Sequence, residues 1–364
     1  MKMKTLPIAV IRNGLPRLGR KLAQGRPVTL AYLGGSITQA WPDGYAYQTT
    51  AWFKKQCPAV AFTEVNAGIG GTGSDLGAYR LRQDVLKHKP DLLFVEFAVN
   101  DSGEGFDVPA AMEGIVRTTR RDLGAECEMA FIYTLEQSLV ADLQAERLPP
   151  ASRLHEPVAE HYGLPSLNVA LDVARRLKAG ELTWADFARD TAHPYPRGHQ
   201  LYCATLVDAL LKAFAAPEIA SPWPTPLTKD PWVGGTMTPI PPNTAFPGWV
   251  YRPLVNRGGW ECFDGLFESN TMGHEAVFEF NGTTIGLFYQ LGPESGDLLW
   301  AVDEGTLTSA RVFDDHADKF WRPCYRILAQ GLPQGRHRLR IQVGSDQDPR
   351  SNGRWVKLAS LMVR

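Results

Sequence analysis

Three residues of this sequence have the types and spacing of a nucleophile, a base and an acid. Ser36 follows a short apolar run and two glycines, and Asp190 and His193 stand three residues apart before a proline. A serine hydroxyl attacks poorly at neutral pH unless a base takes its proton and an acid fixes the tautomer of that base. On one helical turn, this spacing would place Asp190 and His193 on the same face. The pattern predicts that Ser36 is a nucleophile, with His193 as its base and Asp190 as the partner of the base.

Two segments between these residues offer hydrogen-bond donors for a developing oxyanion. The segment 66–71 reads Asn-Ala-Gly-Ile-Gly-Gly, and an N–H of Gly70 or Gly71 can point into a site because no side chain blocks the approach. The amide of Asn100 carries two donors, and a donor of this kind contributes ~2.7–4 kcal/mol to the transition state. Asn66 and Asp101 are expected to brace the loop backbone.

The order Ser, Gly, Asn, Asp-x-x-His resembles the SGNH (GDSL-like) hydrolase family, over roughly residues 26–215. In the family pattern an Asp precedes the serine, where this chain has Gly35, and a Gly begins the third block, where this chain has Ala98. The resemblance implies a flavodoxin-like, three-layer α/β/α domain with a parallel sheet. It also implies an ester hydrolase without metal or organic cofactor. Its oxyanion hole would consist of the N–H groups of Ser36 and Gly71 and the amide of Asn100.

Other aromatic and histidine residues are weaker candidates for binding. Trp41 and Tyr45, just after the nucleophile, are candidate substrate contacts through stacking, with packing in the core as the alternative. His199 lies six residues after His193, but no third ligand stands at metal spacing, so we expect it to be a packing residue that opens the helix through Leu201–Leu211. His155 and His161 lie in a segment that reads as exposed, and both are expected to be solvated.

The first part of the chain alternates apolar and amphipathic segments. Nearly continuous apolar runs predict strands at 28–33, 60–66, 92–99 and 127–134, and helical spacing predicts helices at 45–56, 75–87 and 110–123. Alternating strands and helices indicate a parallel sheet covered on both faces, with ligands at the carboxyl ends of its strands. Ser36, Gly71 and Asn100 all follow predicted strand ends, which is where a site is expected.

After Phe214 the composition and the apolar pattern of the sequence change. Residues 216–247 hold nine prolines and read as a linker, and residues 248–364 show short alternating runs between turn residues, as in a β-sandwich. The predicted organisation is therefore a hydrolase domain at 1–215, a linker at 216–247 and an all-β domain at 248–364. The last segment resembles the jelly-roll accessory modules of some carbohydrate esterases, through Phe280-Asn281-Gly282 and Ala301-Val302-Asp303.

Composition excludes several partner classes. The chain of 364 residues carries 38 basic and 39 acidic residues, which argues against nucleic acid or an anionic membrane as partner. Its five cysteines lack CxxC spacing, which fits a reducing compartment without disulfides or zinc. The apolar stretch 6–11 is too short for a signal-peptide core, so a cytoplasmic protein is predicted. Oligomeric state is left open.

Together these features predict a serine esterase that hydrolyses short acyl esters, with acetyl esters of sugars or oligosaccharides as substrates. Two alternatives stay open. One is a lipid-type acyl hydrolase, such as a lysophospholipase or thioesterase, which would need a long apolar groove. The other is a non-catalytic sugar-binding protein on the same scaffold, although all four blocks of the catalytic pattern are present.

Overall fold

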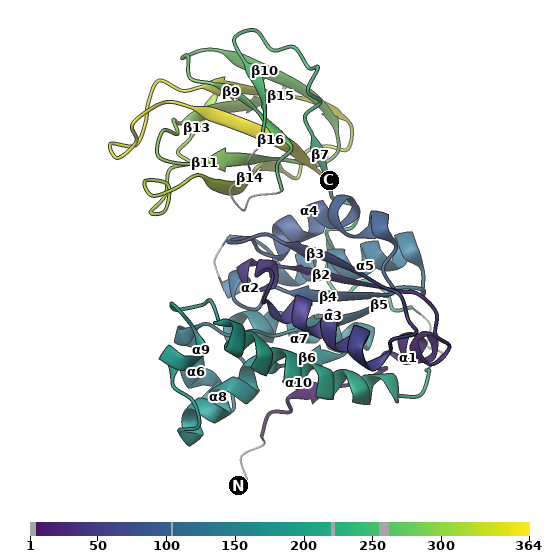
Figure 1. Cartoon of the computed structure of the whole chain (residues 1–364). Coiled ribbons are helices and arrows are strands. Elements are labelled where there is room, and N and C mark those ends of the chain that lie inside the picture. Colours follow the sequence, from purple (N-terminus) through teal and green to yellow (C-terminus); the bar gives the residue numbers. More distant parts are fainter. Residues whose placement is uncertain (1–4, 103–104, 220–222, 255–261) are drawn as a thin grey trace. The chain divides into compact units, whose positions relative to one another are not determined.

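The chain folds into two compact units, Met1–Gly234 and Gly235–Arg364. The computed structural model describes residues 5–102, 105–219, 223–254 and 262–364 (Figure 1). The division falls inside the segment 216–247 that the sequence analysis assigns to a linker. Among the described residues, no helix has both the length and the apolar character needed to cross a membrane.

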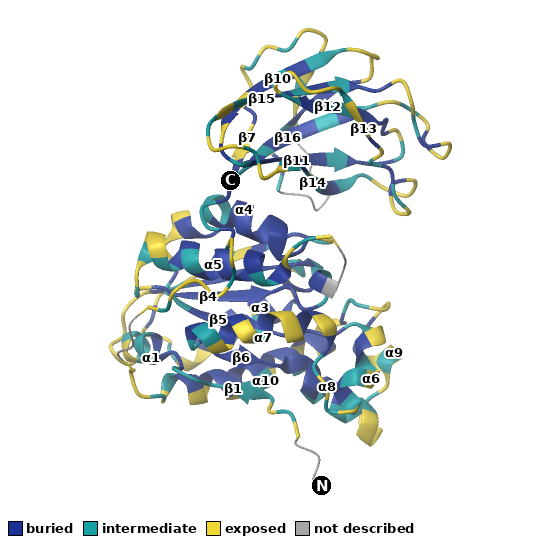
Figure 2. Cartoon of the chain, turned by 180° about the vertical axis from the view of Figure 1, so that it is seen from behind, coloured by how far each residue is buried: buried dark blue, intermediate teal, exposed yellow. Residues whose placement is uncertain are grey.

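The first unit is built on one sheet with the strand order β1-β6-β5-β4-β2-β3. Strands β2 to β6 are parallel, in the flavodoxin-like order, and β1 adds an antiparallel edge. Figure 2 shows the central strands as buried, which explains their continuous apolar runs. The strands are β1 (Ala9–Val10), β2 (Val28–Gly34), β3 (Phe62–Gly68), β4 (Leu92–Glu96), β5 (Glu128–Ile132) and β6 (Ser166–Leu167).

Helices cover both faces of this sheet (Figure 1). Leu30 and Tyr32 of β2 join a core with α1, α3, α8 and α10, whereas Ala31 and Leu33 are buried on the opposite face. The helices are α1 (Pro16–Ala23), α2 (Ser36–Gln39), α3 (Tyr45–Gln56), α4 (Ser74–Asp84), α5 (Val108–Leu123), α6 (Val140–Gln144), α7 (Pro150–Tyr162), α8 (Val169–Ala179), α9 (Trp184–Phe187) and α10 (Pro196–Phe214), with short 3₁₀ turns η1 (Leu86–His88), η2 (Asn100–Ser102) and η3 (Gln137–Leu139).

The segment between α10 and the second unit makes specific contacts with α5. The carboxylate of Glu113 accepts hydrogen bonds from the backbone N–H groups of Leu227 and Thr228, at 2.6 and 2.7 Å. The N–H of Trp232 donates to the carbonyl of Ala110 at 3.0 Å, and the Trp232 side chain is buried. This stretch therefore packs on the first unit.

The second unit consists of two antiparallel sheets, with the orders β10-β15-β12-β13 and β14-β11-β16-β9-β8, and β7 pairs with β16. Alternate residues of β10, β15 and β11 form one apolar cluster between the sheets, as in a β-sandwich. The strands are β7 (Thr236–Pro239), β8 (Val250–Pro253), β9 (Gly265–Ser269), β10 (Glu275–Asn281), β11 (Thr284–Leu291), β12 (Leu298–Val302), β13 (Thr308–Ala310), β14 (Arg322–Gln330), β15 (Arg336–Val343) and β16 (Val356–Val363).

Candidate active site

The predicted nucleophile lies at the junction of β2 and α2. Strand β2 ends at Gly34, and Ser36 is the first residue of α2. The Oγ of Ser36 lies 2.8 Å from Nε2 of His193, which is 157 residues away in the sequence. The fold therefore brings the two residues within hydrogen-bond distance.

His193 and Asp190 lie on a loop between α9 and α10, and the expectation of a helical turn is wrong. Nδ1 of His193 lies 2.9 and 3.0 Å from the two carboxylate oxygens of Asp190. One of these oxygens also accepts the backbone N–H groups of Ala192 and His193, at 2.9 and 2.8 Å. The loop is thus closed by Asp190 itself, in the manner of an Asx turn.

The same contacts favour the ionised form of Asp190. Partial burial alone would raise the pKa of Asp190, but the N–H groups of Ala192 and His193 and the His193 ring together lower this pKa below its ordinary value. An ionised Asp190 accepts the Nδ1–H of His193. Nε2 is then free to accept the proton of the Ser36 hydroxyl.

Asn100 begins η2, shortly after the carboxyl end of β4, and its side chain lies against Gly35. A Cβ atom at position 35 would overlap the side-chain oxygen of Asn100. Glycine is therefore required next to the nucleophile as long as Asn100 keeps this position.

Two glycines after β3, Gly70 and Gly71, are candidates for the second oxyanion donor, and their surroundings differ. The N–H of Gly70 donates to Oε1 of Gln39 at 2.8 Å, so it is already engaged with the end of α2. Gly71 has a φ of 72°, a conformation that favours glycine, and a Cβ there would meet open space. Of the two glycines, Gly70 has its N–H engaged by Gln39, and the role of Gly71 as an oxyanion donor stays a prediction.

Buried hydrogen bonds hold the strand ends beneath these loops. Arg80 of α4 is fully buried and donates to the carbonyls of Gly34 and Ala67, at 3.0 and 2.5 Å. Asn66, expected to brace the loop, donates from Nδ2 to the Thr38 carbonyl at 2.8 Å. The ends of β2 and β3 are thus tied together directly below Ser36.

Tyr45 lies in the core, and the structure does not support its predicted contact with substrate. Its side chain is buried, and its hydroxyl lies 2.9 Å from Oγ1 of Thr38. Thr38 and Thr134 donate to the two carboxylate oxygens of Glu96, at 2.8 and 2.6 Å. Burial raises the pKa of Glu96, although both threonine hydrogen bonds oppose this rise.

Trp41, the other predicted substrate contact, is 75% exposed. It lies in the loop between α2 and α3. Nε2 of Gln48 donates to the carbonyls of Asp43 and Pro196, at 2.6 and 3.1 Å, and so joins this loop to the start of α10. The loop of Trp41 therefore lies beside the loop that carries His193.

Three histidines outside the dyad make hydrogen bonds within the protein. His155, expected to be solvated, is 1% exposed and pairs with Asp101 through Nε2 and Oδ2 at 2.7 Å, so that expectation is wrong. His161 is half-buried and donates to the carbonyl of Thr225 at 2.8 Å. His199 is buried in the first turn of α10, as expected of a packing residue that opens this helix, and its Nδ1 accepts the N–H of Tyr45 at 3.2 Å. Within the described ranges, no three His, Cys, Asp or Glu side chains are grouped so as to hold a metal ion.

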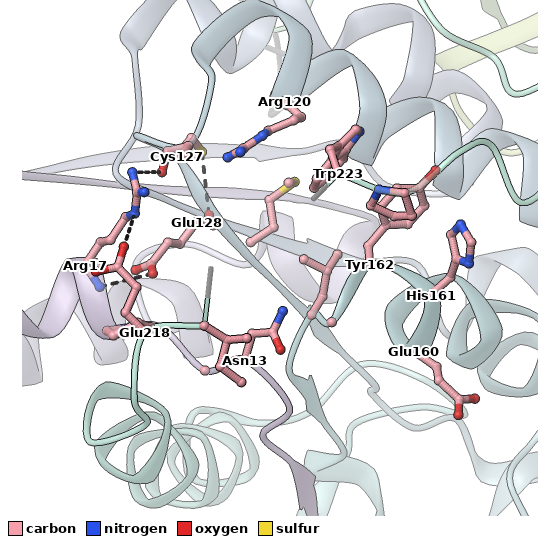
Figure 3. A pocket seen from close by; sticks show the side chains of 18 residues that line it. Asn13, Arg17, Arg120, Cys127, Glu128, Glu160, His161, Tyr162, Glu218 and Trp223 are labelled. Carbon is pink, nitrogen blue, oxygen red and sulfur yellow. Dashed lines mark hydrogen bonds and ion pairs between the residues drawn. The ribbon is translucent and has the colours of Figure 1, made fainter. Parts of the chain in front are cut away.

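A cavity of about 660 Å³ lies elsewhere in the first unit (Figure 3). It is lined by residues at the start of β5, among them Glu128, whereas Ser36 and Asn100 follow the opposite, carboxyl ends of their strands. Glu128 accepts the N–H groups of Arg17 and Leu18 and so caps α1. None of the predicted site residues lines this cavity.

Comparisons with known proteins relate the chain to a family and to a fold. Residues 32–201 match the model of the GDSL-like Lipase/Acylhydrolase family. A comparison with curated protein sequences found no match.

Among solved structures, the chain is similar to a two-domain esterase (CEX) active on acetylated mannans. The TM-score is 0.84 at 24% identity, over 98% of this chain and 97% of that chain. For the same esterase co-crystallised with mannopentaose, the TM-score is 0.82 at 23% identity, over 98% and 96%. A variant of Axe2, an acetyl xylan esterase from Geobacillus stearothermophilus, covers 53% of this chain and 97% of its own, with a TM-score of 0.42 at 21% identity. At these identities the likeness to CEX shows the shared two-domain fold, and the likeness to Axe2 carries no argument.

Proposed function

We propose, from the premise that this chain is a carboxylic ester hydrolase of the GDSL-like lipase/acylhydrolase family, that it removes acetyl groups from sugars or oligosaccharides through an acyl-enzyme on Ser36. The observation that carries this proposal is the chain of contacts from Ser36 Oγ to His193 Nε2, and from His193 Nδ1 to Asp190. A nucleophile, a base and an orienting acid within hydrogen-bond distance are the parts that acyl transfer requires.

In the proposed first half-reaction, Ser36 Oγ forms a bond to the ester carbonyl carbon while its proton passes to His193 Nε2. Asp190 keeps the imidazole oriented and stabilises its positive charge. The N–H groups of Ser36 and Gly71 and the amide of Asn100 are assigned to the tetrahedral oxyanion. The bond to the sugar oxygen then breaks, and His193 returns the proton to the leaving alcohol.

In the second half-reaction, a water molecule replaces the alcohol. His193 takes a proton from the water as it attacks the acyl carbon, and the same donors hold the second tetrahedral oxyanion. Collapse of this intermediate breaks the bond to Ser36 Oγ, which regains a proton from His193. Acetate and free enzyme result, so no redox partner is needed.

The choice of an acetylated sugar as substrate is supported by two observations. The two-domain fold is shared with an esterase described as active on acetylated mannans, which makes a carbohydrate ester the first substrate to test. The exposed Trp41 lies in the loop that Gln48 connects to the start of α10, and aromatic rings of this kind suit stacking on sugars.

The experiment is turnover of p-nitrophenyl acetate by the intact chain and by Ser36→Ala. The variant should lose at least about 10⁴-fold in kcat, because the other groups have no nucleophile to activate. A serine-directed phosphonate should label Ser36, as located by mass spectrometry. Activity retained in Ser36→Ala, or labelling of another serine, would overturn the assignment.

A series of p-nitrophenyl esters, measured beside acetylated manno-oligosaccharides, tests the substrate. Acetyl esters should give the highest kcat/KM among the aryl esters, and the acetylated sugars should exceed them because binding of the sugar positions the ester. If octanoyl or longer esters are the best substrates, the lipid-type hydrolase replaces this proposal. If no ester is turned over, the protein is a binding protein on this scaffold.

A further inference from the structure

A buried aspartate–histidine pair lies behind the loop of Asn100, and the mechanism proposed above does not use it. Asp101 and His155 are each 1% exposed, and their side chains meet at 2.7 Å. Removing such groups from water costs free energy that their mutual contact offsets only with good geometry and further hydrogen bonds. The further bonds of Asp101 therefore indicate what the pair holds in place.

The second oxygen of Asp101 connects two loops of the site. Oδ1 accepts the backbone N–H of Ser74, the first residue of α4, at 2.8 Å. Ser74 follows Gly71 by three residues, and Asp101 directly follows Asn100. A Cβ at Gly73 would lie 2.7 Å from the same oxygen, so the backbone of this turn fits tightly against the carboxylate. One carboxylate thus fixes the Gly71 loop relative to Asn100.

His155 gives the carboxylate one orientation. It comes from the middle of α7, and its ring packs against the rings of Phe131 and Tyr133, with centroids 6.3 and 6.0 Å away. Its Nε2 engages Oδ2 of Asp101, so each carboxylate oxygen has its own partner. Loss of His155 would leave Oδ2 buried without its ring partner, and the carboxylate could rotate away from Ser74.

We propose that Asp101 and His155 are positioning residues for the oxyanion hole: together they set the spacing between the Asn100 amide and the Gly71 N–H. This inference rests on the proposed function, in which both donors stabilise the tetrahedral oxyanion. An interaction made only in the transition state affects kcat and leaves substrate binding nearly unchanged. The pair therefore acts on kcat and on the binding of tetrahedral analogues.

The test compares His155→Leu, His155→Gln and Asp101→Asn with the intact chain, using p-nitrophenyl acetate and phenylboronic acid, which forms a tetrahedral adduct with a catalytic serine. His155→Leu should lower kcat by roughly 10- to 100-fold, less than the ~10²–10³-fold cost of losing a donor itself. Its affinity for the boronate should fall by a similar factor, while KM changes by less than about threefold. His155→Gln keeps a donor for Asp101 and should recover most of kcat.

Glu113→Gln is the matched control. Glu113 is an equally buried carboxylate that also accepts backbone N–H groups, but it anchors the segment 227–228 on α5. This variant should lower the Tm and leave kcat per folded molecule unchanged. If His155→Leu lowers only the Tm, as the control does, and keeps kcat and boronate affinity, the pair is merely structural and the inference fails.

Two further results complete the test. If His155→Leu does not fold, Asp101→Asn decides: a parallel loss of kcat and boronate affinity in this variant supports the inference, and unchanged values overturn it. Failure of the proposed function is seen separately, because Ser36→Ala would then remain active or the wild type would turn over no ester. An active wild type that depends on Ser36 but is insensitive to the pair overturns only the positioning role.

Discussion

At position 35 the chain has a glycine where the family pattern that it resembles has an aspartate. From the sequence alone this change removes a side chain beside the nucleophile. In the structure the space is occupied by the side chain of Asn100, which lies against the Cα atom of Gly35. The glycine and the asparagine therefore form one packing unit next to Ser36.

Gly35→Ala tests this unit. The added methyl group would overlap the oxygen of Asn100 and displace the amide that the proposed mechanism assigns to the oxyanion. We expect kcat on p-nitrophenyl acetate to fall by about 10²–10³-fold, the cost of losing one oxyanion donor. Steady-state kinetics and a boronate inhibition constant measure the effect.

A double-mutant cycle with Asn100→Ala gives the control. If Gly35→Ala acts by displacing Asn100, adding it to Asn100→Ala should cost little more, because the side chain that it displaces is already gone. Independent, multiplying losses in the double variant would contradict the packing argument.

The candidate catalytic residues could be predicted from the sequence. The burial and the hydrogen-bond partners of the residues that support them could not. Ser36, Asn100, Asp190 and His193 stand in recognisable order, and the structure joins Ser36, His193 and Asp190 by hydrogen bonds. Their catalytic roles remain a prediction. The expectation for His155 is wrong because its burial depends on a partner 54 residues away, whereas the charged residues Arg153 and Glu156 stand close to it in the sequence.

At the scale of elements, α3 and α10 meet through a histidine. The N–H of Tyr45, at the start of α3, donates to Nδ1 of His199 in the first turn of α10. Burial lowers the pKa of His199 to about 4, and the charges of Arg189 and His193 add to this effect. His199 is therefore neutral in the folded protein at pH values where an exposed histidine is protonated.

This junction predicts acid sensitivity of the fold. The unfolded chain binds a proton at His199 near the ordinary histidine pKa of 6.5, while the folded chain binds it only near a pKa of about 4. The free energy of unfolding should therefore fall as the pH drops from 6.5 toward 4, by at most about 3 kcal/mol from this residue, and should not change on its account above 6.5.

Urea unfolding measures this contribution. The wild type and His199→Asn are compared at about pH 7 and about pH 4.5, which lie on either side of the ordinary histidine pKa. Asparagine keeps an acceptor for the Tyr45 N–H but does not titrate, so the variant should lose less stability on acidification. The same loss in both proteins would show that other groups cause the acid sensitivity.

Elements with a clear apolar pattern were predictable from the sequence. The helix predicted at 45–56 is α3, whose buried residues recur at helical spacing, and the strand predicted at 28–33 is β2, whose continuous apolar run is buried on both faces of the sheet. Strand β6 has only two residues and shows no pattern. Strand β7 lies among prolines and is held by pairing with β16, more than a hundred residues later. Such elements depend on tertiary partners and not on local preference.

At the scale of the whole molecule, each unit has an apolar cluster of its own. The apolar cluster of the first unit draws on residues 6–214, and that of the second unit on residues 240–363, with no residue in common. A core that is complete within one unit is the usual condition for a domain that folds alone. The candidate site residues Ser36, Asp190 and His193 all belong to the first unit, so truncation can test whether that unit acts alone.

Truncation after Gly234, at the division between the units, tests this separation. The truncated protein should keep hydrolysis of p-nitrophenyl acetate, because Ser36, His193 and Asp190 and their braces all remain. If the aromatic-rich second unit helps to retain a carbohydrate, kcat/KM for acetylated manno-oligosaccharides should fall by roughly tenfold more than for the aryl ester, equivalent to about 1.4 kcal/mol. Circular dichroism and thermal unfolding first establish that the truncated unit is folded. Equal changes on both substrates would assign the second unit a role unrelated to this substrate, because a unit that binds the sugar must favour the sugar ester over the aryl ester.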